Sequence, residues 1–356
     1  MALVLVMAAA LWGVGALVGM PRRGRFIMLG LLYVAVLALH LVLPDGHALR
    51  MSTGESPALW LLIGGFVAVG LIYRRALSAL RRRAQSVESA EPTGGGPAPL
   101  FSETELNRYA RHIVLREIGG PGQKALKEAK VLVIGAGGLG APALQYLAAA
   151  GVGTIGVVDD DVVENANLQR QVIHKDRAIG TPKVFSAQAE MEAQNPYVTV
   201  RPYHRRLTGD IAQDLVTEYD LVLDGTDNFD TRYLVNRAAV AAGKPLISGA
   251  LSQWEGQLSV FDPSKGAPCY QCIFPQAPAP ELAPSCAEAG VIGPLPGVVG
   301  AMMAVEAVKL ITGAGTSLRG QMVIYDALYG ESRTIGIARR GDCPVCGGQS
   351  SRGSGR

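Results

Sequence analysis

The stretch "KVLVIGAGGLG" at positions 130–140 constrains the fold more than any other part of the chain. Its first half is a short β-branched apolar run, which is typical of a buried parallel strand. A G-x-G-x-x-G turn follows, and "APALQYLAAAGV" then predicts a helix. This order predicts an α/β domain with a Rossmann-like, doubly wound and mostly parallel sheet that binds a nucleotide on the turn. The candidate phosphate-binding glycines are Gly135, Gly137, Gly138 and Gly140.

A second apolar run, "TIGVVD" at 154–159, predicts the neighbouring strand and ends on an acidic residue. Asp159 lies about 20 residues past the glycine motif, where a carboxylate is placed to hydrogen-bond a ribose. These features fit NAD, FAD and ATP comparably, because each ligand rests its phosphates on a helix N-terminus. The turn by itself therefore leaves the nucleotide open.

Charged residues farther along the chain favour a triphosphate. Arg170 in "NANLQRQ" and Lys183 in "GTPK" follow the second strand, and Asp227 follows another buried strand, "DLVLDGT". A triphosphate that is attacked at its α-phosphorus gains negative charge, which two cations and a carboxylate-bound Mg²⁺ would neutralise. A nicotinamide cofactor does not require this set, so the sequence predicts ATP with Mg²⁺ rather than a nicotinamide or flavin oxidoreductase.

Three further polar residues belong to the candidate nucleotide site. Asn167 and Asn228 complete the predicted contacts, although Asn228 also suits the cap of the helix that follows it. Asp224 is the rival to Asp227 as the Mg²⁺ ligand, and its place near a strand end equally suits a structural hydrogen bond.

Three apolar runs, at 2–20, 26–43 and 58–73, precede this domain. Each approaches the roughly 20 residues that a helix needs to cross a bilayer, and none contains Asp, Glu, Lys or Arg. They predict a membrane anchor over residues 1–83 with three transmembrane helices. A soluble core helix for the third run and a signal peptide for the first are the alternatives.

Basic clusters orient this anchor. "PRRGR" separates the first two runs and "RRALSALRRR" follows the third, which places the C-terminal domain in the cytoplasm and the N-terminus outside. Residues 84–100 are rich in Gly, Pro, Ala, Ser and Glu and predict a flexible linker. A soluble domain follows at 101–348, and residues 349–356 are expected to form a disordered tail. The formal net charge is only +3, so no nucleic-acid partner is expected.

Four of the five cysteines form two C-x-x-C pairs, "CYQC" and "CPVC". Four thiolates suit a closed tetrahedral structural zinc site, and a reducing cytoplasm disfavours the disulfide alternative. The predicted ligands are Cys269, Cys272, Cys343 and Cys346. The fifth, Cys286, follows a Pro-rich stretch, which predicts that its thiol lies in a loop.

Five motifs in order, among them "RYARHIVL", "IGTPKV" and "DGTDNFDTRYLVN", closely resemble the ThiF/MoeB/HesA family, bacterial relatives of the ubiquitin-activating enzymes. The resemblance runs from about Leu106 to Cys346 and agrees with the zinc site. It implies ATP-dependent adenylylation of the C-terminal glycine of a ubiquitin-like sulfur-carrier protein of the ThiS or MoaD type, with release of pyrophosphate, for thiamine or molybdopterin synthesis.

The resemblance also implies roles for single residues. Gly138 would lie in the ATP loop, Asp159 on the ribose, Arg170 and Lys183 on the phosphates, and Asp227 at Mg²⁺ or the reacting carboxylate. Arg111 matches an arginine that reaches the γ-phosphate from the partner subunit of a homodimer. Cys286 occupies a loop whose cysteine forms a thioester or acyl-disulfide in some members, which leaves a catalytic role and a plain loop thiol both open. Ala166 departs from the Ser that is frequent in the family.

The resemblance extends to partners and location. Together with the apolar runs and the basic clusters, it leads us to expect a bacterial inner-membrane enzyme with a cytoplasmic catalytic domain. No sulfurtransferase domain follows the second cysteine pair, so the sulfur is expected from a separate donor protein. The alternative substrates are another carboxylate, such as a peptide C-terminus, or a modified tRNA base.

Overall fold

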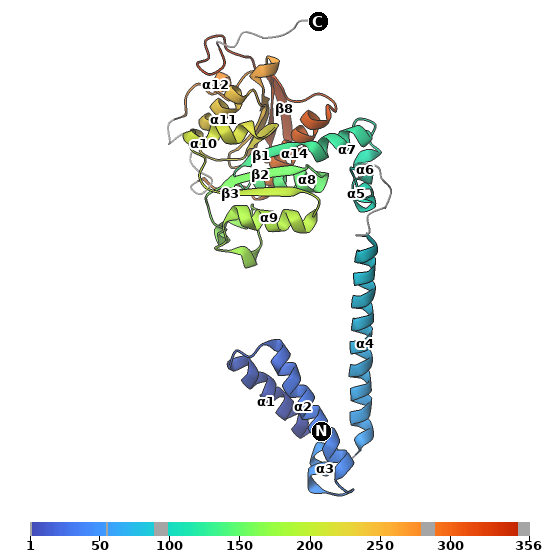
Figure 1. Ribbon diagram of the computed structural model, residues 1–356. Helices are drawn as coiled ribbons and strands as arrows, with labels where there is room; N and C mark the ends of the chain where they lie inside the picture. Colours follow the sequence, from blue (N-terminus) through green and yellow to red (C-terminus); the bar gives the residue numbers. More distant parts are fainter. Residues whose placement is uncertain (1, 55, 89–98, 279–288, 348–356) are drawn as a thin grey trace. The chain divides into compact units, whose positions relative to one another are not determined.

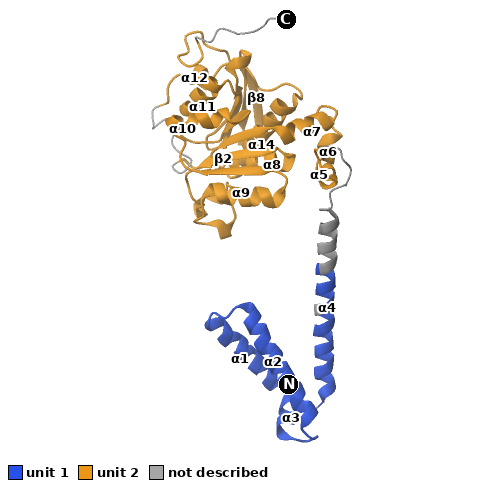
Figure 2. Cartoon of the chain, viewed as in Figure 1, with its two compact units in different colours: residues 1–97 blue, residues 98–356 orange. Residues whose placement is uncertain are grey.

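The computed structural model describes residues 2–54, 56–88, 99–278 and 289–347. The chain divides into two compact units, residues 1–97 and 98–356, which Figure 2 shows in different colours. The predicted C-terminal tail lies outside the described residues, as does most of the predicted linker.

The first unit consists of helices α1 (Ala2–Leu17), α2 (Arg22–Val42), α3 (Ala48–Thr53) and α4 (Pro57–Glu88). The hydroxyl of Tyr33 on α2 donates a hydrogen bond of 2.7 Å to the carbonyl of Trp60 on α4. Val4, Val36 and Trp60 form a small apolar cluster between the helices. Most other large apolar side chains described in this unit are exposed, such as Phe66 at 78%.

By length and composition, α2 and the part of α4 from Pro57 to Ser78 suffice to cross a membrane, whereas α1 is shorter. Helix α4 is longer than the predicted apolar run at 58–73, and it includes 84–88, the first residues of the predicted linker. The added sequence is rich in Ala, Leu, Arg, Gln and Glu, which are good helix formers even where hydropathy falls.

The second unit is built on an eight-stranded sheet in the order β3-β2-β1-β4-β5-β6-β7-β8 (Figure 1). The first five strands in this order are parallel, and β6, β7 and β8 extend the sheet antiparallel. The strands are β1 (Lys130–Ile134), β2 (Thr154–Asp159), β3 (Thr199–His204), β4 (Leu221–Asp224), β5 (Leu246–Leu251), β6 (Glu255–Phe261), β7 (Gln321–Asp326) and β8 (Glu331–Gly336). The predicted Rossmann-like, mostly parallel sheet is confirmed, and the strand order reverses between β1 and β4, where such sheets bind ligands.

Helices cover both faces of the sheet. One apolar core lies beneath α8 (Gly140–Ala150), α9 (Lys183–Gln194) and α14 (Pro294–Thr312). The other lies beneath α10 (Gly209–Thr217) and α11 (Phe229–Ala242). The remaining short elements are α5 (Glu103–Arg108), α6 (Ala110–Ile113), α7 (Gly119–Glu128), α12 (Tyr270–Ile273) and the 3-10 turns η1 (Asn165–Asn167), η2 (Asp176–Ala178) and η3 (Pro263–Lys265).

Helix α14 is also apolar and long enough to span a membrane, but it belongs to the sheet core. Val299 and Met303 are buried against the strands. Glu306 pairs with Lys309 and accepts a hydrogen bond of 2.9 Å from the backbone N–H of Leu318. The two charges that interrupt the apolar pattern are therefore satisfied inside the domain.

Candidate active site

A cavity of about 1120 Å³ opens at the carboxyl edge of the parallel strands. Ligand pockets typically hold about 300 to 1,000 Å³, so this space is large enough for a nucleotide and part of a second substrate. Residues after β1, β2, β4 and β5 line it. Of the predicted site residues, the cavity wall includes Gly135, Gly137, Gly138, Asp159, Arg170, Lys183, Asp227 and Asn228.

The glycine turn forms the wall between β1 and α8. Gly135 has a φ of +91°, which other residues rarely adopt, and its N–H donates to the carbonyl of Val158 at 2.8 Å. Gly140 lies outside the cavity lining, and a Cβ there would come within 1.8 Å of the carbonyl oxygen of Gly135. Within the described part of the chain, no hydrogen bond uses the backbone N–H of Gly137 or Gly138. These two groups are free to receive phosphate oxygens.

Asp159 ends β2 and ties the turn to the next loop. One carboxylate oxygen accepts from the backbone N–H of Ala136 at 2.8 Å, and the other accepts from that of Asp161 at 2.9 Å. Burial raises the pKa of Asp159 above its usual range, against the opposing charge of Lys183 and the two N–H donors. The carboxylate is thus held in place beside the predicted ribose position.

The two predicted cations are held differently. Lys183 opens α9, and its buried ammonium lies 2.7 Å from a carboxylate oxygen of Asp161, which is 67% exposed. Arg170 donates to the side-chain oxygen of Asn167 at 3.2 Å. Asn167 itself does not line the cavity, so it orients the arginine rather than facing the ligand space.

The loop between β4 and α11 carries the predicted metal ligand. Asp227 is exposed to the cavity, and Asn228 both lines it and caps α11 by accepting from the N–H of Thr231 at 2.9 Å. Asp224 is fully buried and accepts from the backbone N–H and the hydroxyl of Thr226 at 3.0 and 2.7 Å. Asp224 therefore shapes the loop, while Asp227 faces the substrate space.

A buried arginine braces the same loop. Arg232 of α11 donates to the carbonyl of Thr226, to the Ser248 hydroxyl at 3.1 Å and to the Gly249 carbonyl at 2.8 Å. Its guanidinium joins the loop that carries Asp227 to strand β5, and it lines the cavity.

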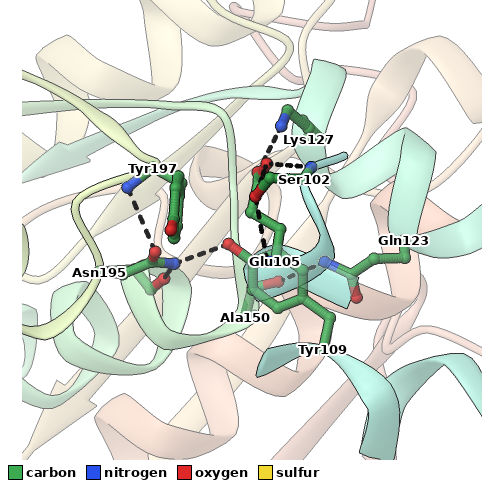
Figure 3. Close-up of polar contacts among 9 residues, drawn as sticks. Ser102, Glu105, Tyr109, Gln123, Lys127, Ala150, Asn195 and Tyr197 are labelled. Atoms are coloured by element: carbon green, nitrogen blue, oxygen red, sulfur yellow. Dashed lines mark hydrogen bonds and ion pairs between the residues drawn. The ribbon is translucent and has the colours of Figure 1, made fainter. Parts of the chain in front are cut away.

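Arg111 lies on α6, is exposed and does not line the cavity of its own chain. Its position is set by a polar cluster that joins α5 and α7 to the sheet domain (Figure 3). The Asn195 amide donates to the Tyr109 hydroxyl at 2.8 Å, Gln123 donates to the carbonyl of Ala150 at 2.9 Å, and Lys127 pairs with the buried carboxylate of Glu105. The segment that bears Arg111 is therefore fixed to the domain.

The four predicted zinc ligands lie together, and none of them lines the cavity. Their sulfur atoms all lie within 4.8 Å of one another, and the four side chains are buried. Sulfur separations are 3.8 Å for Cys269 and Cys272, 3.6 Å for Cys269 and Cys343, and 3.4 Å for Cys272 and Cys346. These distances exceed the roughly 2.05 Å of a disulfide bond, so the four are thiols. Burial raises the pKa of Cys343, but N–H groups of Cys346 and Val345 bring it to about 7.

Cys286 lies outside the described residues. The cavity also contains residues that were not predicted: Gln171, the pair Arg205 and Arg206 after β3, and Arg232. The two arginines form a tandem basic signal in the sequence, but their relevance depends on β3 lying beside β2.

Comparisons with known proteins agree with this geometry. The ThiF family pattern matches residues 109–345. The chain is 49% identical over 256 residues to the sulfur carrier protein adenylyltransferase of Thermus thermophilus, covering 71% of this chain and 94% of that protein. It is 52% identical over 251 residues to the probable adenylyltransferase/sulfurtransferase MoeZ of Mycobacterium tuberculosis, covering 70% of this chain and 64% of MoeZ.

The fold is also similar to that of a solved structure. The crystal structure of E. coli MccB with ATP superposes with a TM-score of 0.59 at 25% identity, covering 68% of this chain and 75% of that one. The family match over residues 109–345 spans the glycine turn, Arg170, Lys183, Asp227 and three of the four clustered cysteines. The chain therefore belongs to the ThiF family.

Proposed function

We propose that this protein adenylylates the C-terminal glycine of a ubiquitin-like sulfur-carrier protein, using ATP and releasing pyrophosphate. One observation carries the proposal: a single cavity brings together the free N–H groups of the glycine turn, Arg170, Lys183 and Asp227. The similarity to the sulfur carrier protein adenylyltransferase supports the choice of acyl substrate.

The arrangement suits in-line attack of the carrier carboxylate on the α-phosphorus. Lys183 would move from Asp161 to the phosphates, and Arg170, held by Asn167, would offset the charge that develops on the departing pyrophosphate. The reaction needs no side-chain nucleophile, because positioning and charge neutralisation lower the barrier. Asp227 would hold Mg²⁺, which neutralises the triphosphate when bound.

Exchange of labelled pyrophosphate into ATP, dependent on added carrier, tests this function. The D227A variant should lose the exchange while keeping its thermal unfolding temperature. D230A is the matched control, since Asp230 is exposed on the same segment and lies outside the cavity lining. Exchange retained by D227A would contradict the role assigned to Asp227. Exchange that depends on a different carboxylate substrate, and not on the carrier, would show that the carrier is not the acyl substrate.

The four thiols fit a structural zinc ion. A tetrahedral ion with Zn–S bonds of about 2.3 Å separates its sulfur ligands by about 3.8 Å, close to the separations of 3.8, 3.6 and 3.4 Å in this cluster. The backbone N–H of Arg340 also points to the sulfur of Cys272 at 3.4 Å, as expected around a thiolate ligand. Zinc at this site would fasten the C-terminal segment to α12 and serve no step of the reaction.

A homodimer would complete the site. Arg111 is fixed to its own domain yet does not face its own cavity, which supports a role at the γ-phosphate of a partner subunit. Mixing R111A and D227A chains tests this directly, because hybrid dimers would contain one intact site. Activity restored in the mixture supports the role of Arg111 across the interface, and its absence in verified hybrid dimers contradicts it.

The first unit would anchor the enzyme in a bacterial inner membrane, with the catalytic domain in the cytoplasm. The exposed apolar surfaces of α2 and α4, the arginines at the start of α2 and the basic residues after the apolar part of α4 support this placement. A separate donor protein would supply sulfur for thiamine or molybdopterin synthesis. Membrane fractionation, followed by protease protection of the C-terminal domain, tests the location.

A further inference from the structure

A buried histidine lies behind the glycine turn. His174 is 4% exposed and comes shortly after Arg170 in the chain. Its Nε2 lies 2.9 Å from the carbonyl oxygen of Ala136, the residue between Gly135 and Gly137. Its Nδ1 lies 2.9 Å from the hydroxyl oxygen of Ser186, which is buried on α9 one turn beyond Lys183. The imidazole thus connects the turn to the helix that presents the lysine.

The two contacts define the state of the ring. A carbonyl oxygen only accepts, so Nε2 must carry the proton. Nδ1 of the neutral ring then accepts from the Ser186 hydroxyl. Burial lowers the pKa of His174, and the nearby charges of Lys183 and Lys175 act in the same direction, while the Ala136 carbonyl and Glu190 oppose them. The neutral ring with its proton on Nε2 is therefore the stable form at neutral pH.

The backbone of Ala136 is held through both of the peptide groups that flank its Cα. Its N–H donates to Asp159 at 2.8 Å, and its carbonyl accepts from His174 at 2.9 Å. The Gly137 N–H lies in the same planar peptide group as the Ala136 carbonyl and points the opposite way, and the Gly138 N–H follows in the next peptide group. Neither N–H has a hydrogen-bond partner within the described part of the chain. Rotation of the Ala136 carbonyl would turn the next N–H away from the cavity.

We propose that His174 is a positioning residue for nucleotide binding, which holds the Ala136 carbonyl so that the following N–H groups point at the phosphates. It couples the turn to α9, and hence to Lys183, without touching the ligand. This inference rests on the proposed use of ATP and adds a residue that acts on phosphate binding but not on the carrier.

Amide substitutions separate the two contacts of the ring. The amide nitrogen of Gln reaches the position of Nε2, whereas that of Asn reaches only the position of Nδ1. Calorimetric titration of the full-length protein in detergent with Mg-ATP measures affinity without any carrier. The Kd should rise about three- to tenfold for H174A and H174N, the loss expected for one buried hydrogen bond. H174Q should stay within about twofold of the wild type.

Equal weakening in H174Q and H174N would overturn the inference, and so would unchanged affinity in H174N. Should H174A unfold, the comparison of the two amide variants still decides. In steady-state assays, the KM for ATP should rise in H174N while the KM for the carrier stays constant, a split that general loosening of the fold would not produce. Wild-type protein that binds Mg-ATP but catalyses no pyrophosphate exchange with any carrier protein would contradict the proposed function. The comparison of ATP affinities among the His174 variants would remain valid in that case.

Discussion

Replacement of Arg232 by Met should both destabilise the domain and slow the reaction. Arg232 is 5% exposed, and its guanidinium donates to the carbonyls of Thr226 and Gly249 and to the hydroxyl of Ser248. Met fills much of the same volume but donates nothing, so three oxygen atoms lose a charged donor. At about 1 to 3 kcal/mol for each buried acceptor left without a donor, the free energy of unfolding should fall by about 3 kcal/mol or more.

The kinetic effect follows from the loop that the guanidinium braces. Without the bond to Thr226, Asp227 would no longer be held at one position on the cavity wall. Displacement of a catalytic group by about 1 Å costs up to about a hundredfold in rate. The kcat of pyrophosphate exchange should therefore fall by about tenfold to a hundredfold at a temperature where the variant stays folded.

Urea unfolding and exchange kinetics measure the two effects on the same preparation. R237M is the matched control, because Arg237 lies on the same helix and is exposed. R232K should be intermediate, since an ammonium keeps the charge but cannot bridge three acceptors in the planar arrangement of a guanidinium. A loss below about 1 kcal/mol in R232M, equal to that of R237M, would refute the bracing role.

Three further predictions address other parts of the chain. C343S or prolonged chelation should lower the thermal unfolding temperature of the second unit, and metal analysis of the wild type should return one zinc per chain; unchanged stability in metal-depleted protein would argue against a structural ion. Because burial holds the pKa of His174 below its usual 6.5, the unfolded chain takes up the proton first as pH falls. The contribution of neutral His174 to the free energy of unfolding should therefore be fully present above about pH 6.5. Below that pH the free energy of unfolding should fall by up to about 1.4 kcal/mol per pH unit, until the pH reaches the lower folded pKa. Urea midpoints across pH should show a shallower decline in H174Q, and parallel curves for the wild type and H174Q would contradict the assignment. Deletion of residues 1–85 should give a soluble enzyme that still exchanges pyrophosphate, and a folded but inactive truncation would indicate a further role for the first unit.

Local patterns predicted much of the site because its chemistry lies at strand ends. The order of strand, glycine turn and helix placed Gly135, Gly137 and Gly138 on the cavity wall, and the acidic strand end placed Asp159 beside them. Such features depend on residues that are close in the sequence. Gly140 was harder to interpret. A side chain there would collide with the carbonyl oxygen of Gly135, and from the sequence alone this packing requirement cannot be distinguished from a requirement to contact phosphate.

Contacts between distant segments were not predictable in the same way. The roles of Arg205 and Arg206 depend on β3 lying beside β2, and that of His174 depends on Ala136 and Ser186, which lie 38 and 12 residues away. Hydropathy also cannot distinguish a helix packed on a sheet from one in lipid. In the structure, Glu306 and Lys309 interrupt the apolar pattern of α14 and pair within the domain.

The four-cysteine cluster joins positions that are 74 residues apart, as in the pair Cys269 and Cys343. Metal at this point would turn α14, β7 and β8 into part of a closed ring of chain. A cross-link around a loop of that length lowers the entropy of the unfolded chain by about 4 to 5 kcal/mol in free-energy terms, if the metal stayed bound after unfolding. A single backbone cleavage anywhere inside the ring would leave the two fragments joined, so nicked protein should run as two bands only after the metal is removed.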